Sequence, residues 1–313
     1  MRILIFGAGA VGQGVGGLLA SAGHNVTLIV RPRFRDALAE GGLTVTGVFG
    51  THVVAPGRMR VVAAAAEAGA GFDLVVLAVK SYDTAAAVDG LAAAAGGNTP
   101  IVSMQNGYGN VELLAGRFGR GRVLCARVIT GFRIPAPGEV AITVHADDVR
   151  VGSFWLAAHP AAAALAEALD AAGLPSEAVD NVEAVLWAKI LYNCALNPLG
   201  AILGVHYGAL ADSPDTRALM DAVIDEAFAV MGAHGFPCLW PGAAAFREAF
   251  YGEMVPPTYD HRPSMLQDLE AGKRIEIDAL NGAIVRLAGE QGVPAPVNET
   301  IVRLIRFLAK AHG

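Results

Sequence analysis

Short apolar runs alternate with stretches of helical periodicity along the first 130 residues of the chain. Continuous apolar runs, of which Phe72–Val79 is the clearest, are typical of strands that are buried on both faces of a parallel sheet. Residues 84–94 follow that run with the periodicity of a helix. Repeated strand–helix order predicts a right-handed, doubly wound sheet. The expected strands are Ile3–Phe6, Val26–Val30, Leu43–Thr46, His52–Ala55 (a hairpin with the preceding run), Val61–Ala64, Phe72–Val79, Ile101–Met104 and Val123–Thr130.

The rhythm changes at Gly131. Three apolar runs, Phe132–Ile134, Val140–Val144 and Val149–Gly152, come close together, and a turn containing Pro and Gly separates the first two. We expect these runs to be antiparallel strands added at the edge of the sheet. A helix over residues 160–172 follows them.

Beyond residue 181 only helical periodicity remains. The chain, with 313 residues, is longer than a typical single domain. We therefore place a boundary near residue 178, between an α/β domain at 1–178 and an all-helical domain at 179–313. The expected helices of the second domain are 181–197, 215–235, 241–251, 263–271, 275–291 and 297–311.

Composition narrows the class of protein. With 54% hydrophobic and 17% charged residues, the chain can fill a large core and is not disordered. A net charge of −6 argues against a nucleic-acid partner, and no uncharged apolar stretch is long enough to span a membrane. The three cysteines form no CxxC pattern. We expect a cytoplasmic protein, because neither a cleavage site nor a disulfide framework is evident.

A glycine-rich turn follows the first strand. Gly7-Ala8-Gly9-Ala10-Val11-Gly12 reads GxGxxG between a strand and a helix, within one βαβ unit. Gly7 permits a tight turn, Gly9 lets the backbone approach a pyrophosphate, and Gly12 lets the helix pack closely on the strand. The pattern predicts a dinucleotide site in a Rossmann-type domain; the alternative is a glycine-rich turn that binds nothing.

Arg31 ends the second strand. It stands 19 residues after Gly12 (31 − 12), where an NAD site usually has Asp or Glu. A guanidinium suits the 2′-phosphate of NADP through paired, charge-assisted hydrogen bonds. We therefore expect NADPH as the cofactor, unless Arg31 merely belongs to a solvated loop.

Polar residues also follow later strands of the expected sheet. Ligands of such sheets bind beyond the carboxyl ends of the strands, and that rule selects Lys80 and Asn106. Lys80 could neutralise phosphate or fix a ribose, or be an ordinary loop lysine. Asn106 precedes Gly107, so simple turn chemistry would also explain it.

Three polar residues share one stripe of an apolar helix. Lys189, Asn193 and Asn197 are spaced i, i+4 and i+8. A cationic donor beside two amides could receive a carboxylate and a carbonyl oxygen; a solvent-facing stripe without chemistry is the alternative. Downstream, Ser264 has the position of a helix N-cap, with Gln267 completing a capping box. Of the later acids Glu276 and Asp278, only one can face a given cleft.

Together these segments resemble the ketopantoate reductase (2-dehydropantoate 2-reductase) family over nearly the whole chain. The segments that carry the resemblance are GAGAVG at 7–12, Arg31, AVKSYDT at 78–84, QNG at 105–107, WAKILYNCALNPL at 187–199 and PSMLQDLEAGKRIEIDALNG at 263–282.

The resemblance implies NADPH-dependent reduction of a 2-keto acid, 2-dehydropantoate to pantoate in pantothenate biosynthesis. It implies that Lys189 donates the proton to the keto oxygen. It implies that Asn193, Asn197 and Ser264 hold the substrate, while Asn106 and Glu276 contact the cofactor. An ammonium group suits this chemistry, because hydride addition builds negative charge on the keto oxygen.

Two positions depart from the family pattern, which usually has Asn where this chain has Tyr207 and Thr where it has Ile275. The sequence therefore does not decide which 2-keto acid is the substrate. One alternative to 2-dehydropantoate is another 2-keto acid or an opine-type substrate. A third hypothesis is an NADPH-binding regulator without turnover. The histidines show no ligand spacing, so we expect no metal. The sequence does not fix the oligomeric state, and a homodimer is compatible with it.

Overall fold

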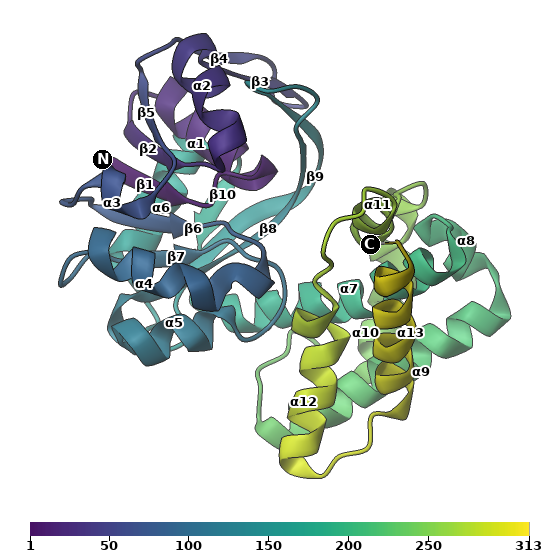
Figure 1. The fold of residues 1–313 in the computed structure, drawn as a ribbon. Coiled ribbons are helices and arrows are strands. Elements are labelled where there is room, and N and C mark those ends of the chain that lie inside the picture. The colour runs from purple at the N-terminus through teal and green to yellow at the C-terminus, as the bar shows by residue number, and fades with distance from the viewer. Residues whose placement is uncertain (313) are drawn as a thin grey trace. The chain divides into compact units, whose positions relative to one another are not determined.

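The computed structural model describes residues 1–312, and these form two compact units. Unit 1 comprises Met1–Gln105 and Asn110–Val182, and unit 2 comprises Asn106–Gly109 and the chain from Glu183 onward. The purple-to-teal ribbon of Figure 1 is a sheet covered by helices, and the green-to-yellow ribbon is helical. The predicted fold class, an α/β Rossmann-type sheet plus an all-helical C-terminal domain, is thereby confirmed.

One sheet of ten strands forms the frame of unit 1, in the order β4-β3-β9-β8-β7-β6-β1-β2-β5, with β10 paired to β9. Strand β1 is parallel to β2 and β6 on its two sides. Each apolar run expected to be a strand before residue 131 overlaps an observed strand, although runs such as Val61–Ala64 and Phe72–Val79 extend beyond the strand ends. The strands are β1 (Arg2–Phe6), β2 (Asn25–Ile29), β3 (Leu43–Gly47), β4 (His52–Val54), β5 (Met59–Val62), β6 (Leu74–Leu77), β7 (Ile101–Ser103), β8 (Val123–Arg133), β9 (Glu139–Gly152) and β10 (Ser176–Ala178).

The prediction for residues 132–152 is wrong in its placement. Residues 132 and 133 continue β8, and the next two runs form the single strand β9. β9 lies inside the sheet, antiparallel to β8 and parallel to β3, rather than at an edge. Register shifts between Arg127 and Phe132 explain how one long strand accommodates this, because bulges add bend and twist.

Helices cover both faces of the sheet, as a doubly wound fold requires (Figure 1). The core on one face joins Val15 and Leu18 of α1 to Ile3 and Leu28 of the sheet. Alternate residues of the same strands, such as Leu4, are buried too, which explains why the strands read as continuous apolar runs. The helices are α1 (Ala10–Ser21), α2 (Pro32–Gly41), α3 (Ala65–Ala68), α4 (Thr84–Ala94), α5 (Asn110–Phe118) and α6 (Pro160–Ala171), with 3-10 turns η1 (Ser81–Asp83) and η2 (Arg120–Arg122).

Unit 2 is built around the long helix α7 (Val182–Leu203), which begins at the end of unit 1. Two predictions need correction here. The sequence did not predict the short helix α8, and the single helix predicted over 275–291 is instead the 3-10 turn η5 followed by the separate helix α12. Leu280, with φ −107° and ψ −110°, is not helical and divides them. The remaining elements are α8 (Tyr207–Asp212), α9 (Pro214–His234), α10 (Ala243–Ala249), the π-turn η3 (Phe250–Met254), η4 (Pro256–Thr258), α11 (Ser264–Glu270), η5 (Ile277–Ala279), α12 (Asn281–Gln291) and α13 (Pro296–His312).

Helix α7 continues through Pro198, although the sequence predicted its end at 197. Proline cannot donate to the carbonyl four residues earlier, which is that of Cys194. The fully buried Asn281 of α12 takes over this role, since its Nδ2 donates to the Cys194 carbonyl at 3.0 Å and to Asn298 Oδ1 at 2.9 Å. A side chain distant in sequence therefore supplies the missing helical hydrogen bond.

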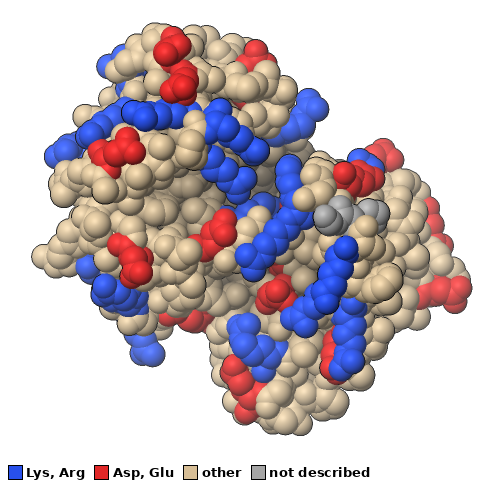
Figure 2. Space-filling view, in the orientation of Figure 1, with Lys and Arg blue, Asp and Glu red and all other residues tan. Residues whose placement is uncertain are grey.

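In the described part of the chain, residues 1–312, every helix is too short or too polar to cross a membrane. On the face shown in Figure 2, acidic and basic side chains are interspersed over unit 1, as on an ordinary solvated surface.

Candidate active site

The turn between β1 and α1 has the shape that its three glycines predict. Gly7 has φ +95°, and a Cβ atom there would lie 2.3 Å from Val79 Cγ1 and 2.7 Å from the Val79 nitrogen. A Cβ atom on Gly12 would lie 2.6 Å from the carbonyl oxygen of Gly7. Larger residues at Gly7 or Gly12 would therefore collide with the strand ends.

Gly9 differs from both. Its φ of −73° is open to any residue, and a Cβ atom there would meet nothing within 4 Å. The space above this backbone is therefore free, and Gly9 is the N-cap of α1. The first-turn amides of Ala10, Val11 and Gly12 precede the intrahelical hydrogen bonds, so a phosphate could accept from them at the positive end of the helix dipole.

Arg31 lies beyond the end of β2, as the N-cap of α2, and is exposed. Of the three neighbouring arginines, Arg33 lies over the ring of Phe34 and Arg35 is 3.8 Å from Glu67. The guanidinium of Arg31 makes no ion pair with any of residues 1–312. Arg31 therefore has a guanidinium that is free to meet a phosphate.

A buried polar network joins the loops beyond β6 and β7. Gln105 Nε2 donates to the Val79 carbonyl at 3.0 Å and to Thr84 Oγ1 at 2.6 Å. Thr84 Oγ1 in turn lies 2.7 Å from Asn110 Oδ1. Lys80, at the start of η1, is half-buried beside this network. The network fixes the loop that carries Lys80, which the sequence selected by position alone.

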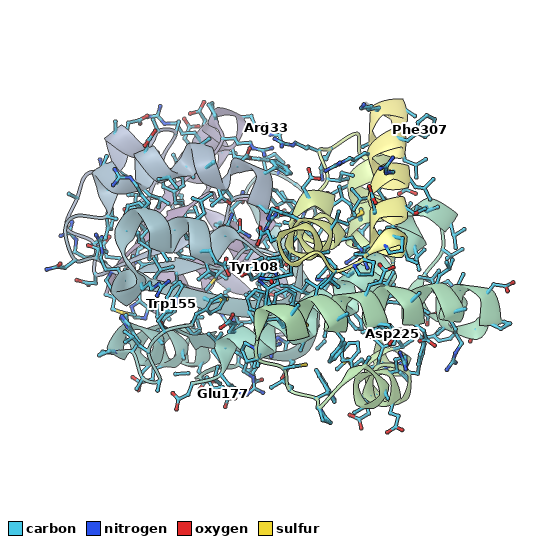
Figure 3. The ribbon with its side chains drawn as sticks, turned by 90° about the horizontal axis from the view of Figure 1, so that it is seen from below. Arg33, Tyr108, Trp155, Glu177, Asp225 and Phe307 are labelled. Carbon is cyan, nitrogen blue, oxygen red and sulfur yellow. The ribbon has the colours of Figure 1, made fainter. Side chains whose placement is uncertain are left out.

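Residues 106–109 pack with unit 2 rather than with the sheet from which they emerge. The amide of Tyr108 donates to the Ala279 carbonyl at 2.8 Å, and its ring lies 5.0 Å from that of Trp187 on α7 (Figure 3 labels Tyr108). Gly107 has φ +81°, and a Cβ atom there would lie 2.3 Å from the Ala279 oxygen. The glycine of the Asn-Gly step is therefore needed for this contact.

Lys189 reaches the segment 106–109 directly. It is half-buried on α7, and its Nζ donates to Asn106 Oδ1 at 2.6 Å. Two residues predicted from separate motifs, 83 positions apart, thus meet within unit 2. The contact holds the ammonium at a defined position.

Asn193 and Asn197 follow Lys189 along the same face of α7 and hydrogen-bond each other. Asn197 Nδ2 donates to Asn193 Oδ1 at 3.1 Å, and Ser264 Oγ donates to Asn197 Oδ1 at 3.2 Å. The structure thereby brings together the three residues expected at the substrate. The capping-box prediction for Ser264 is wrong: Pro263 is the N-cap of α11, and Gln267 bonds the Arg262 carbonyl instead. The rigid proline displaces the start by one residue, which turns the serine hydroxyl towards α7.

Glu276 and Asp278 point to different surroundings, as their spacing predicted. Asp278 is exposed and accepts from Arg306 of α13 at 2.6 Å. Glu276 is half-buried at the N-cap of η5, two residues before that surface pair. Asp278 is therefore committed to a surface ion pair, and Glu276 stays the acid predicted to contact the cofactor.

No group of three His, Cys, Asp or Glu side chains gathers within residues 1–312 as a metal site would require.

Comparison with known proteins decides the family. Residues 3–155 match the family Ketopantoate reductase PanE/ApbA, and residues 181–309 match its C-terminal domain, Ketopantoate reductase PanE/ApbA C terminal. The chain belongs to the ketopantoate reductase family. This is a family of oxidoreductases, so the predicted class of enzyme is confirmed.

Two relatives of this family member are similar over their full length. It is 39% identical to a 2-dehydropantoate 2-reductase of Aquifex aeolicus, over 98% of this chain and 96% of the relative. It is 35% identical to that of Archaeoglobus fulgidus, over 97% of each chain. Among solved structures, a PanE/ApbA family ketopantoate reductase from Ralstonia eutropha JMP134 superposes with a TM-score of 0.87 at 34% identity, covering 100% of this chain and 99% of that one.

The sequence did not predict one residue that hydrogen-bonds to the polar side chains on α7. Tyr207 was noted only as a departure from the family pattern, yet its hydroxyl donates to Asn197 Oδ1 at 3.1 Å. A tyrosine just before Gly208 carries no spacing signal that ties it to a helix ten residues earlier. Only the return of the chain through α8 brings it there.

Proposed function

We propose that this chain reduces a 2-keto acid with NADPH, and that the substrate is 2-dehydropantoate, with pantoate as the product for pantothenate biosynthesis. The observation that carries the proposal is the contact of Lys189 Nζ with Asn106 Oδ1 inside a cluster of polar side chains. The identity to 2-dehydropantoate 2-reductases along the whole chain supports the choice of substrate. The free thiols, two of them buried, are compatible with a reducing cytoplasm.

The residues of unit 1 fit a dinucleotide. The open space over Gly9 would admit a pyrophosphate to the amides at the start of α1, and Arg31 offers an unpaired guanidinium to a 2′-phosphate. Lys80 adds positive charge beyond β6. Asn106 and Glu276, which belong to unit 2, are the groups we assign to the nicotinamide end of the cofactor. When bound, NADPH supplies the hydride.

In the reaction, Lys189 stabilises the charge that develops on the keto oxygen and gives that oxygen its proton. Asn106 accepts from the ammonium at 2.6 Å, which holds the proton donor at a fixed position on α7. Asn193, Asn197 and Ser264 receive the carboxylate and the rest of the substrate. This arrangement needs no metal, because the ammonium is both the electrostatic stabiliser and the acid.

The test is loss of NADPH absorbance with 2-dehydropantoate and with a panel of other 2-keto acids. Lys189→Met should lower kcat by roughly 10²- to 10⁴-fold, the usual contribution of a positioned acid, while leaving NADPH binding unchanged. Lys310→Met, which removes an exposed lysine from α13, is the matched control. Equal losses of turnover and NADPH affinity in Lys189→Met would remove this residue from the chemistry. Failure of every 2-keto acid with the native chain would defeat the proposal.

The cofactor preference has its own test. Arg31→Ala should raise the KM for NADPH roughly 10-fold or more and leave the KM for NADH nearly unchanged, because only NADPH carries the phosphate. Arg33→Ala removes a neighbouring guanidinium that lies over Phe34 and serves as the control. An unchanged NADPH-to-NADH ratio in Arg31→Ala would move the phosphate contact to another residue.

A further inference from the structure

A line of hydrogen bonds runs from a buried tyrosine to the substrate-facing stripe of α7. The Tyr207 hydroxyl donates to Asn197 Oδ1 at 3.1 Å, and Asn197 Nδ2 donates to Asn193 Oδ1 at 3.1 Å. All three residues belong to unit 2. The line ends one helical turn from Lys189.

Asn197 is the inner member of this line. It is only 4% exposed, and its Oδ1 accepts from both Tyr207 and Ser264. An amide whose oxygen faces two hydroxyl donors must turn its Nδ2 the other way, towards Asn193. Tyr207 is 3% exposed, and burial raises the pKa of its phenol, so the hydroxyl stays protonated.

Asn193 is the outer member and is half-buried. Its Oδ1 is taken by Asn197, and its Nδ2 makes no hydrogen bond to any other part of residues 1–312. The group it has left for a ligand is therefore a donor. Together with the ammonium of Lys189, it offers donors only, which suits a carboxylate or a keto oxygen.

We propose that Tyr207 is a positioning residue, which sets the amide of Asn197 and through it fixes Asn193 as a hydrogen-bond donor to the carboxylate of the substrate. This inference rests on the proposed reduction of a 2-keto acid. It assigns Asn197 a part in orienting its neighbour, and it gives the tyrosine that departs from the family pattern a role in substrate binding.

Tyr192 provides a matched control. It lies on α7, its ring is 5.8 Å from that of Tyr207, and its half-buried hydroxyl hydrogen-bonds Thr258 rather than Asn197 or Asn193. Tyr207→Phe and Tyr192→Phe thus each remove one hydroxyl from the same aromatic cluster. Tyr207→Phe should raise the KM for the 2-keto acid roughly 5- to 10-fold, as expected for the loss of one buried hydrogen bond, with the KM for NADPH unchanged. Tyr192→Phe should leave both values unchanged.

A double-mutant cycle separates positioning from general loosening. If Tyr207 acts through Asn193, then Tyr207→Phe should cost nothing further in kcat/KM once Asn193→Ala is present. Fully additive losses, or equal losses in the two phenylalanine variants, would overturn the proposal.

A measurement without substrate keeps the test independent of the enzymatic assignment. In protein labelled with ¹⁵N-asparagine, the side-chain amide signals of Asn193, assigned with Asn193→Ala, should shift in Tyr207→Phe and stay in place in Tyr192→Phe. Unmoved signals in Tyr207→Phe would refute the line of hydrogen bonds, whatever the substrate. Moved signals in a chain that reduces no 2-keto acid would leave the line standing and overturn its role in carboxylate binding, together with the proposed function.

Discussion

The hydrogen bond that Asn281 gives to α7 should be one of the costly ones to remove. The two hydrogens of its Nδ2 serve the Cys194 carbonyl and Asn298 Oδ1, and both Asn281 and Asn298 are fully buried. Asn281→Ala would strip two buried acceptors of their donor. At about 1–3 kcal/mol for each unsatisfied group, and with the orphaned Oδ1 of Asn281 removed at the same time, we expect a loss of about 2–4 kcal/mol in the free energy of unfolding.

The measurement is urea denaturation followed by far-UV circular dichroism and by the fluorescence of the tryptophans, since Trp187 is buried on α7. Asn181→Ala, at an exposed residue just before α7, is the control and should leave the midpoint unchanged.

A substitution at Pro198 tests whether Asn281 replaces the hydrogen bond that this proline cannot make. Pro198→Ala restores a backbone N–H that can donate to the Cys194 carbonyl inside the helix. In that background Asn281→Ala should cost about 1 kcal/mol less than in the native chain, because one of the two acceptors keeps a donor. Equal costs in both backgrounds would show that Asn281 does not replace the hydrogen bond that proline removes.

Two further outcomes follow from local geometry. Gly9→Ala should leave the unfolding midpoint nearly unchanged while weakening NADPH binding, because its Cβ atom enters open space. Gly7→Ala should destabilise unit 1, because Gly7 has φ +95° and its Cβ atom would lie 2.3 Å from Val79 Cγ1. Equal unfolding midpoints of the two variants in thermal scans would contradict this prediction. Burial alone would raise the pKa of Asp147, but hydrogen bonds and the charges of Arg127 and Arg150 lower it overall. The ionised carboxylate therefore stabilises the folded state above the unfolded-state pKa. This stabilisation is lost as pH falls through the lower folded-state pKa. Asp147→Asn should therefore cost about 1–2 kcal/mol at neutral pH, reduced because the carboxylate is 43% exposed, and should match the native chain only once pH falls below the lowered folded-state pKa of Asp147. Asp148→Asn, at the next position, is the control.

Much of the fold could be predicted because its strands are buried on both faces. Phe72–Val79 reads as an unbroken apolar run for that reason, and the strand within it, β6, lies beside β1 in the middle of the sheet. The strands after residue 131 are half-exposed and bulged, so their pattern does not tell which neighbour each end pairs with. The sequence also did not predict where α7 ends. Pro198 normally signals the end of a helix, but Asn281, a residue 83 positions further along the chain, supplies the hydrogen bond that the proline cannot make.

The residues of the candidate site were likewise predictable where local spacing identifies them, and not where tertiary packing brings them together. Lys189, Asn193 and Asn197 could be grouped from the sequence because helical spacing places them on one stripe. Asn106 could be selected because it follows a strand. Their meeting could not be predicted, since it depends on residues 106–109 packing with α7 rather than with the sheet. Local periodicity therefore identifies the groups that carry the chemistry, whereas the contacts that hold them in place come from loops whose partners are set by tertiary packing.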